Sequence, residues 1–354
     1  MAFTKPPKIS KSKINLAGKI LAGNYSNGLS LPDAISIADT WRACHAYPIN
    51  TFQSTLRRKL KKFSNDTLVA QRLKRMPTII EKLQRYPRMQ LARMQDIGGV
   101  RAILNSVHDV YLLAQEYKDK SRFHHELVGE KDYIESPRDE DGYRSLHLVY
   151  KYRNKQNKEY NGLLLELQIR TKLQHIWATA VETMGTFLGQ ALKSRLGDRA
   201  WLDFFSVVST AFASKENTNL LNKHKIKTQK EIFKMVASMN NELQVLEKIK
   251  GYSVAVEEIN KKGTSYLGWS YHLIILNSEL KTVQIKPYKR GDIKQATEDY
   301  AKVELETAQS GGKIEAVLVS AGPLSALKQA YPNFFLDIGG FVREVEDIIK
   351  QSNS

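Results

Sequence analysis

The stretch Gln95-Asp96-Ile97-Gly98-Gly99-Val100-Arg101 sets a carboxylate and two glycines at the start of a run of strand-forming residues. Further along the chain stands Glu166-Leu167-Gln168-Ile169-Arg170-Thr171, within an alternating segment from 163 to 169 whose one face is Leu163, Leu165, Leu167 and Ile169. This alternation predicts a strand with apolar side chains on one face and Glu166 on the other. Together the two stretches predict strands that carry a pair of carboxylates to one phosphate-handling site.

The two carboxylates are candidate ligands for Mg²⁺, a hard cation that takes one or two protein oxygens and leaves the other positions to phosphate and water. Asp96 lies at a strand entrance, where Gly98 and Gly99 allow a ligand to approach the backbone closely. Plainer interpretations stay open. An acid before two glycines is common in turns, and Glu166 beside Arg170 is compatible with an ion pair on a half-exposed strand.

A third stretch, Asp141-Gly142-Tyr143-Arg144-Ser145-Leu146-His147, combines a turn with the start of another alternating segment. The turn places Tyr143 at the mouth of the predicted strand, where its ring is free to stack on a base. His147 lies on the strand itself, opposite its apolar face. The alternatives are an ordinary aromatic at a sheet edge and a hydrogen-bonded strand histidine.

These motifs resemble the synthetase domain of the RelA/SpoT homologue family, over roughly residues 50 to 190. The resemblance extends to Arg72-Leu73-Lys74 and on to Lys82, which is similar to the ATP-binding segment of the family. It implies an α+β fold with a nucleotidyltransferase-like mixed β-sheet flanked by helices. It also implies transfer of the β,γ-pyrophosphate of ATP to a ribose hydroxyl, with ATP and Mg²⁺ as cofactors.

Residue roles follow from the same resemblance. Asp96 and Glu166 would be catalytic and bind Mg²⁺, with Glu166 also the candidate general base. Tyr143 and His147 would stack on the acceptor. The ATP-binding residues would be Arg72, Lys74, Lys82 and Arg101.

The charge of the chain is concentrated near its start. The net charge is +17, and residues 1 to 95 carry +14 of it, whereas residues 252 to 354 carry −1. The densest basic cluster lies on a helix predicted to begin at a Thr51 cap, and its members are Arg57, Arg58, Lys59, Lys61 and Lys62. Such a cluster is often a solvated helix face, but a nucleotide acceptor does not require it and a polyanion such as tRNA does.

Four segments are predicted along the chain. A basic N-terminal arm (1–29) precedes the pyrophosphotransferase domain (30–214), whose first helix is capped by Ser30. Residues 215–251 have the apolar spacing of one long connecting helix, and residues 252–354 have the pattern of a small α+β domain. The single Cys44 excludes an internal disulfide, and no apolar run is long enough to span a membrane. We expect a cytoplasmic protein and a monomer.

The segment from Ala326 to Asp337 resembles the C-terminal part of the CapRel family of fused toxin–antitoxins. That resemblance implies a pseudo-zinc-finger antitoxin domain that blocks the ATP site until a phage structural protein, such as capsid protein, binds it. Tyr331 and Phe334 correspond to the blocking Tyr-x-x-Tyr pair of the family, although a core aromatic pair is an equal alternative. The resemblance further implies that the acceptor is the 3′-CCA end of tRNA, whose modification stops translation.

Three hypotheses follow for the function. The first is a tRNA pyrophosphotransferase restrained by its own C-terminal domain as an anti-phage toxin. The second is an alarmone synthetase that makes (p)ppGpp or (p)ppApp from free nucleotides, since Tyr143 would stack on either acceptor. The third is a non-catalytic module that binds RNA or senses phage, which the intact charged residues argue against.

Overall fold

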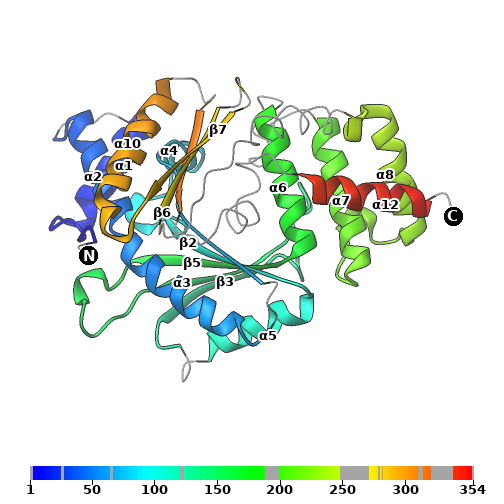
Figure 1. The fold of residues 1–354 in the computed structure, drawn as a ribbon, viewed down its shortest axis with the longest axis horizontal. Coiled ribbons are helices and arrows are strands. Elements are labelled where there is room, and N and C mark those ends of the chain that lie inside the picture. Colours follow the sequence, from blue (N-terminus) through cyan, green and yellow to red (C-terminus); the bar gives the residue numbers. More distant parts are fainter. Residues whose placement is uncertain are drawn as a thin grey trace.

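A mixed five-stranded sheet forms the centre of the computed structural model (Figure 1). The structure describes residues 3–24, 28–63, 67–119, 123–187, 199–247, 271–277, 280, 282–309, 314–319 and 338–352. The strands are Leu68–Leu73 (β1), Gly98–Leu104 (β2), Glu126–Asp132 (β3), Leu146–Lys151 (β4) and Leu164–Thr171 (β5). They lie in the order β1-β2-β5-β4-β3, where β2 and β5 are parallel and the other pairs are antiparallel. The predicted α+β class and the predicted alternating strand are confirmed.

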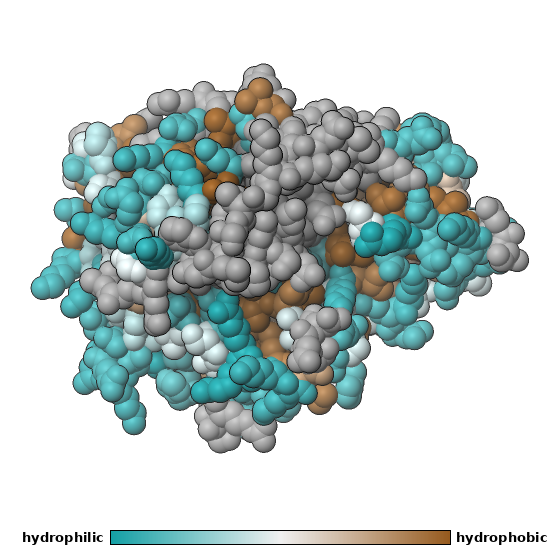
Figure 2. Space-filling view, viewed as in Figure 1, coloured by the Kyte–Doolittle hydropathy of each residue, from teal (hydrophilic) through white to brown (hydrophobic). Residues whose placement is uncertain are grey.

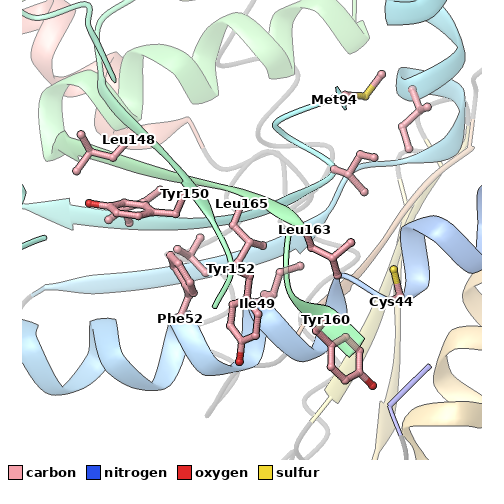
Figure 3. Packing of buried hydrophobic residues seen from close by; sticks show 14 of the residues in the cluster. Cys44, Ile49, Phe52, Met94, Leu148, Tyr150, Tyr152, Tyr160, Leu163 and Leu165 are labelled. Carbon is pink, nitrogen blue, oxygen red and sulfur yellow. The ribbon is translucent and has the colours of Figure 1, made fainter. Parts of the chain in front are cut away.

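One face of this sheet is covered by helices α3 and α5 (Figure 1). The helices of the first half are Lys11–Leu21 (α1), Leu31–Ala43 (α2), Ala46–Leu60 (α3), Met76–Arg85 (α4) and Val107–Lys118 (α5), with 3₁₀ turns Leu91–Arg93 (η1) and Lys158–Tyr160 (η2). Phe52 of α3 packs against Tyr150 and Tyr152. Ile49 of the same helix lies on this apolar face of the sheet, near Leu165 of β5 (Figure 3). All of these side chains are buried, so this face forms the main hydrophobic core.

A helical bundle stands at the end of β5 and forms a second core (Figure 1). Its helices are Lys172–Phe187 (α6), Arg199–Lys215 (α7), Gln229–Leu243 (α8) and Gly339–Ser352 (α12), with the 3₁₀ turn Asn222–His224 (η4). Phe341 of α12 is fully buried, with its ring centroid 5.7 Å from that of Phe205 and 6.1 Å from that of Phe212. Lys215 of α7 forms ion pairs with Glu344 and Asp347. The last helix therefore packs into the bundle, although the sequence predicted it as part of a separate C-terminal domain.

A small antiparallel sheet lies on the other side of the molecule, beside β1 and α4. It consists of Tyr271–Asn277 (β6), Thr282–Tyr288 (β7) and Ile314–Val319 (β8) in the order β7-β6-β8, with the 3₁₀ turn Arg290–Asp292 (η6) and the helix Ile293–Gln309 (α10). The guanidinium of Arg42 on α2 lies 4.9 Å from the centre of the Tyr300 ring on α10. This cation–π contact joins the small sheet to the N-terminal helices.

The surface agrees with the basic, polar composition of the chain. Among the described residues in Figure 2, hydrophilic side chains dominate the view and hydrophobic ones form small areas. No helix of the described ranges is long and apolar enough to cross a membrane.

Two helix predictions are wrong. The helix predicted to begin at Thr51 starts at Ala46, and the Thr51 hydroxyl lies within it and donates to the carbonyl of Tyr47 at 3.2 Å. The single helix predicted over 215–251 is interrupted between α7 and α8, because Thr228 and Glu231 form a capping box that starts a new helix. Ile226, predicted as a core position, lies in the interruption and is 96% exposed.

The prediction for the N-terminal segment also differs from the structure. Ser30 caps α2 as predicted, by accepting a hydrogen bond from the amide of Asp33. Residues 11 to 21 of the predicted arm form α1, however, and its Ile14 and Ile20 are buried against α2 and η1. The apolar face of α1 explains this, because its isoleucines lie on one side of a basic helix.

Replacing Phe341 with alanine tests whether α12 belongs to the bundle. Because the ring is fully buried between two aromatic neighbours, we expect Phe341→Ala to lower the free energy of unfolding by about 3–5 kcal/mol. Chemical denaturation of the full chain measures this change. Ile226→Ala is the control, since it removes apolar atoms from an exposed position and should change stability by less than about 0.5 kcal/mol. Equal effects of the two substitutions would contradict the bundle.

Candidate active site

The strand register gathers polar side chains on the face of the sheet opposite α3. One row across the sheet consists of Arg72, Gly99 and Glu166, since Gly99 pairs with both of its neighbours. The next row consists of Arg101, Gln168 and His147. Residues in register share a face, so these side chains project together.

The two glycines before β2 have different roles. Gly99 leaves the floor between Arg72 and Glu166 open, because an added Cβ would meet no heavy atom closer than 3.6 Å, the carbonyl oxygen of Glu166. Gly98 faces the core instead, where a Cβ would come within 2.8 Å of Leu165 and 3.0 Å of Ile49. Close approach of a ligand is therefore possible at Gly99, whereas packing requires Gly98 to be small.

These rows form the floor of a cavity of about 670 Å³. Helix α6 contributes one wall, and the segment after α4 contributes another. The charged residues that line the cavity are Arg72, Lys74, Lys82, Arg93, Arg101, Lys131, Arg138, Arg170, Asp96, Glu166 and Glu182. Eight lysine and arginine side chains thus face three carboxylates, and this excess suits a polyanionic ligand.

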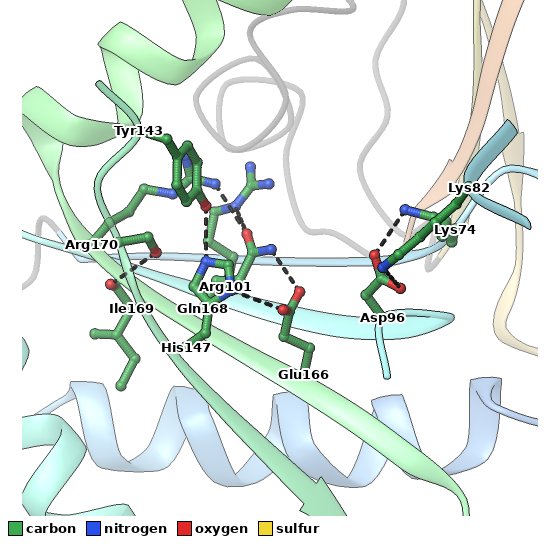
Figure 4. Close-up of polar contacts among 11 residues, drawn as sticks. Lys74, Lys82, Asp96, Arg101, Tyr143, His147, Glu166, Gln168, Ile169 and Arg170 are labelled. Carbon is green, nitrogen blue, oxygen red and sulfur yellow. Dashed lines mark hydrogen bonds and ion pairs between the residues drawn. The ribbon is translucent and has the colours of Figure 1, made fainter. Parts of the chain in front are cut away.

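Asp96 is held by two lysines at one side of the cavity (Figure 4). Lys74 donates to Oδ2 and Lys82 to Oδ1, each at 2.9 Å. Burial alone would raise the pKa of the Asp96 carboxyl, but the two ammonium charges outweigh burial and hold the pKa well below its usual range. Asp96 is therefore ionised at neutral pH.

Glu166, His147 and Tyr143 form a hydrogen-bonded chain on the other side (Figure 4). His147 Nδ1 lies 2.9 Å from Glu166 Oε1, and His147 Nε2 lies 2.9 Å from the hydroxyl of Tyr143. Burial lowers the pKa of His147, but Tyr143 and Glu166 raise it to about 9. Burial likewise raises the pKa of Glu166, but His147 lowers it to about 2. At neutral pH the geometry favours an imidazolium paired with a carboxylate.

Between these groups lies a pair of arginines with a shared amide. The Gln168 side-chain oxygen accepts from Arg101 Nε at 3.3 Å and from an Arg170 guanidinium nitrogen at 3.2 Å, and the Gln168 amide nitrogen donates to Glu166 at 2.8 Å. Burial, and after it repulsion from Arg170 and Arg72, lowers the pKa of Arg101 to about 9. Because these positive charges repel one another, an anion bound beside them would be strongly stabilised.

A short loop fixes the position of Tyr143. Its amide donates to Asp141 Oδ1 at 3.0 Å, Arg138 pairs with the same carboxylate, and the Arg138 guanidinium lies 4.5 Å from the centre of the Tyr143 ring. Gly142 has a φ of +81°, and Ser209 of α7 donates to its carbonyl and accepts from Arg144 Nε at 3.1 Å. The bundle thus holds the loop that presents Tyr143, whose ring is already covered on one side by Arg138.

Most of the residues predicted from sequence meet in this cavity. Eight predicted site residues line it: Arg72, Lys74, Lys82, Asp96, Arg101, Tyr143, His147 and Glu166. The basic cluster of α3 does not, because α3 covers the opposite face of the sheet, next to Ile49 and Leu165. Lys59 and Lys62 of that cluster both pair with Glu116 of α5 at 3.1 Å, so part of the cluster serves an internal contact. Tyr331 and Phe334 lie outside the described residues.

Other residues of the cavity were not assigned a role from sequence. Gln168 and Arg170 share the polar face of β5 with Glu166, so the alternation that revealed one of them contained the signal for all three. His175, Thr179 and Glu182 line the wall formed by α6, at a spacing that is typical of one helix face. Tyr86 and Arg93 lie after α4, where no regular pattern marks them.

The donors present fit Mg²⁺. Asp96 and Glu166 supply carboxylate oxygens to the same cavity, and the charge of Asp96 acts to raise the pKa of Glu166. Within the described ranges, no group of three or more His, Cys, Asp or Glu residues is placed to hold a metal ion.

Comparison with known proteins identifies this part of the chain. Residues 71–185 match the region found in RelA/SpoT proteins. The RelA/SpoT region contains all eight predicted site residues of the cavity, whereas the α3 cluster and the small sheet lie outside it. The resemblance to RelA/SpoT synthetases is thereby confirmed for these residues, and the CapRel subtype stays a prediction.

Individual relatives match over the same part. GTP pyrophosphokinase YjbM of Bacillus subtilis is 34% identical over 113 residues, which are 31% of this chain and 52% of the relative. GTP pyrophosphokinase YwaC of the same organism is 32% identical over 113 residues, 30% of this chain and 52% of the relative. The chain thus spans about half the length of these relatives. The crystal structure of small alarmone synthetase 1 from B. subtilis bound to pppGpp aligns over 49% of this chain and 89% of that one, at 26% identity and a TM-score of 0.42.

Two glycine substitutions test how the Tyr143 loop is held. We expect Gly142→Ala to cost about 1–2 kcal/mol in stability from the left-handed backbone, and more because its Cβ would lie 2.8 Å from that of Ser209. Gly162→Ala is a matched control, since the φ of Gly162 is also positive, at +88°, but the nearest heavy atom would lie 3.9 Å from the added Cβ. Chemical denaturation of both variants measures the difference. Equal losses would show that contact with α7 does not constrain the loop.

Proposed function

We propose that the chain is an ATP-dependent pyrophosphotransferase. The observation that carries this proposal is the cavity, where two ionised carboxylates lie among eight lysine and arginine side chains beside an aromatic ring. In the reaction, a ribose hydroxyl oxygen attacks the β-phosphorus of ATP, the bond to the bridging oxygen of the α-phosphate breaks, and AMP leaves. Such a transfer depends on positioning and on neutralisation of charge more than on covalent help from the protein.

The residues of the cavity divide into two groups in this proposal. ATP would be bound on the Asp96 side of the cavity by the first group, which consists of Arg72, Lys74, Lys82 and Arg101. Asp96 and Glu166 would hold Mg²⁺, which neutralises charge on the transferred phosphates when it is bound. Tyr143 would stack on the acceptor. His147 lies 2.9 Å from both the Tyr143 hydroxyl and the Glu166 carboxylate, and so orients both side chains. Glu166 stays the candidate to take the proton of the attacking hydroxyl.

The acceptor we propose is the 3′ end of tRNA. Support comes from the mouth of the cavity, where Tyr86 is 49% exposed and lines the opening together with Arg93. Of the basic residues between Lys82 and Gln95, Lys82 pairs with Asp96 and Arg85 with Glu81, whereas Arg88 and Arg93 are exposed. An exposed aromatic among arginines suits the stacking and phosphate contacts of a single strand. This surface adjoins the cavity, which the α3 cluster does not.

An alarmone synthetase is the second candidate. The observation in its favour is that two relatives of the RelA/SpoT region carry the name GTP pyrophosphokinase. In that case the acceptor is a free nucleotide, and the basic segment at the cavity mouth has no part in binding it.

Transfer of label from γ-labelled ATP decides between the acceptors. We incubate the full chain with labelled ATP, Mg²⁺ and either total tRNA or a mixture of GDP, GTP and AMP. We expect label on tRNA, and about a tenfold loss of that label in Arg88→Glu because a phosphate contact is lost. The double variant Arg57→Glu with Arg58→Glu is the control on the opposite face and should retain labelling. Loss in the control alone would place the RNA on α3, and label only on free nucleotides would favour the alarmone synthetase.

Restraint of the enzyme by its C-terminal part is a further element of the proposal. Strand β8 lies beside β1, which carries Arg72, and helix α10 lies near α4, which carries Lys82. A phage structural protein that pulled this sheet away would alter the donor side of the cavity. Removing residues 252–354 is a poor test, because it would also remove α12 and uncover the apolar face of the bundle.

Arg42→Gln tests the restraint without truncation. It removes the cation–π contact to Tyr300, which is worth about 0.5–2 kcal/mol, so we expect basal transfer to rise by between about two- and thirtyfold if the sheet restrains the enzyme. Lys302→Gln, an exposed position on α10, is the matched control. Unchanged transfer in Arg42→Gln, with both variants folded, would contradict restraint through this contact.

A further inference from the structure

Both oxygens of the Asp96 carboxylate are occupied by ammonium groups. Lys74 and Lys82 each donate at 2.9 Å, one to each oxygen, and the Asp96 side chain is only 21% exposed. A divalent cation at this carboxylate needs at least one of these oxygens. The same lysines are the groups proposed to bind the phosphates of ATP. The two lysines therefore hinder binding of the cation at Asp96. While they are paired with Asp96, they are also not available to bind the phosphates of ATP.

The backbone holds Lys74 beside Asp96, so side-chain rotation is the motion that separates this pair. The amide of Lys74 donates to the carbonyl of Ile97 at 2.7 Å, and Leu73 pairs with Gly98, which ties the end of β1 to the residues after Asp96. Lysine has a long, flexible stem with a point charge at its end, and this stem allows the ammonium to exchange partners without movement of the main chain.

Outside Asp96, positive charges outnumber carboxylates in the surroundings of these lysines. The cavity around them is lined by further cations, among them Arg72, Arg93 and Arg101. An ammonium displaced from Asp96 into this surrounding would lose its carboxylate and move among like charges. A polyphosphate removes this penalty, because it offers several anionic oxygens to the displaced ammonium groups.

We infer that Lys74 and Lys82 act as an exchangeable counter-ion pair. They neutralise Asp96 in the empty cavity, exclude a divalent cation from it, and transfer to the polyphosphate when both ligands enter. The lysine pair thus makes the binding of cation and polyphosphate interdependent, beyond the affinity of the two ligands for each other. This inference rests on the proposed function for the identity of the ligands, but concerns binding and requires no turnover.

Mn²⁺ bound to the full-length chain is the probe, detected by electron paramagnetic resonance with and without inorganic tripolyphosphate. The free Mn²⁺ is corrected for its complex with tripolyphosphate measured without protein. For the native sequence we expect weak binding of Mn²⁺ alone and at least about tenfold tighter binding once tripolyphosphate is present. In Lys82→Met, Mn²⁺ alone should bind about tenfold more tightly than in the native protein, because one oxygen of Asp96 is uncovered, and the gain from tripolyphosphate should shrink.

Lys131→Met is the matched control. Lys131 also lines the cavity, and its removal lowers the positive charge equally without affecting the hydrogen bonds between Asp96 and its two lysines. Equal Mn²⁺ affinities in Lys82→Met and Lys131→Met would overturn the inference, because general electrostatics would then explain the effect. Equal affinity of the native protein with and without tripolyphosphate would overturn it too. Lys74→Met gives the same comparison if Lys82→Met does not fold, as judged by circular dichroism.

The outcomes also separate this inference from the proposed function. Interdependent binding without any transfer of label would leave the counter-ion pair intact and count against the pyrophosphotransferase. Transfer of label together with tight binding of Mn²⁺ in the absence of tripolyphosphate would support the pyrophosphotransferase and count against the counter-ion pair.

Discussion

The parallel pairing of β2 with β5 is the constraint on which the rest of the site depends. Its register puts Gly99 opposite Glu166 and Arg101 opposite Gln168, and the antiparallel neighbours add Arg72 on one side and His147 on the other. A shift by one residue would turn Glu166 into the core and bring leucines to the cavity. The apolar face that packs on α3 opposes such a shift, because Leu165 and Leu167 are buried there. The core on one face of the sheet thus fixes the chemistry on the other.

Residues whose neighbours are local or periodic were predictable from sequence. The strand around Glu166 followed from its alternation, and the start of α2 followed from Ser30, whose capping contact lies within three residues. The interruption between α7 and α8 was missed although Thr228 and Glu231 have capping-box spacing, because the apolar periodicity on both sides hid it. The location of Arg57 and Arg58 relative to the cavity depends on which face of the sheet α3 covers. That choice is a tertiary one, which charge along the chain does not encode.

The bundle links the C-terminal helix to the acceptor side of the cavity by a continuous set of contacts. Phe341 of α12 packs against α7, and Ser209 of α7 bonds to the Gly142 carbonyl of the loop that presents Tyr143. Helix α6 adds a second route, since Trp177 donates to the carbonyl of Phe205 at 2.7 Å while its neighbours on the helix line the cavity. The small sheet contacts the donor side instead, at β1 and α4. The small sheet thus lies directly beside β1, whereas α12 is connected to the Tyr143 loop through α7.

The excess of positive charge in the cavity favours the binding of an anionic ligand. Arg101 and Arg170 share one amide oxygen of Gln168, which is a neutral acceptor and cannot compensate two positive charges. Glu182 attracts both of them, yet the lysine and arginine side chains of the cavity still outnumber its carboxylates by eight to three. Each carboxylate that faces the centre is already paired, Asp96 with two lysines and Glu166 with His147. An anion with several charged oxygens would relieve the remaining repulsion among the arginines, and the inferred role of the lysine pair requires the same anion before Asp96 becomes available to a cation.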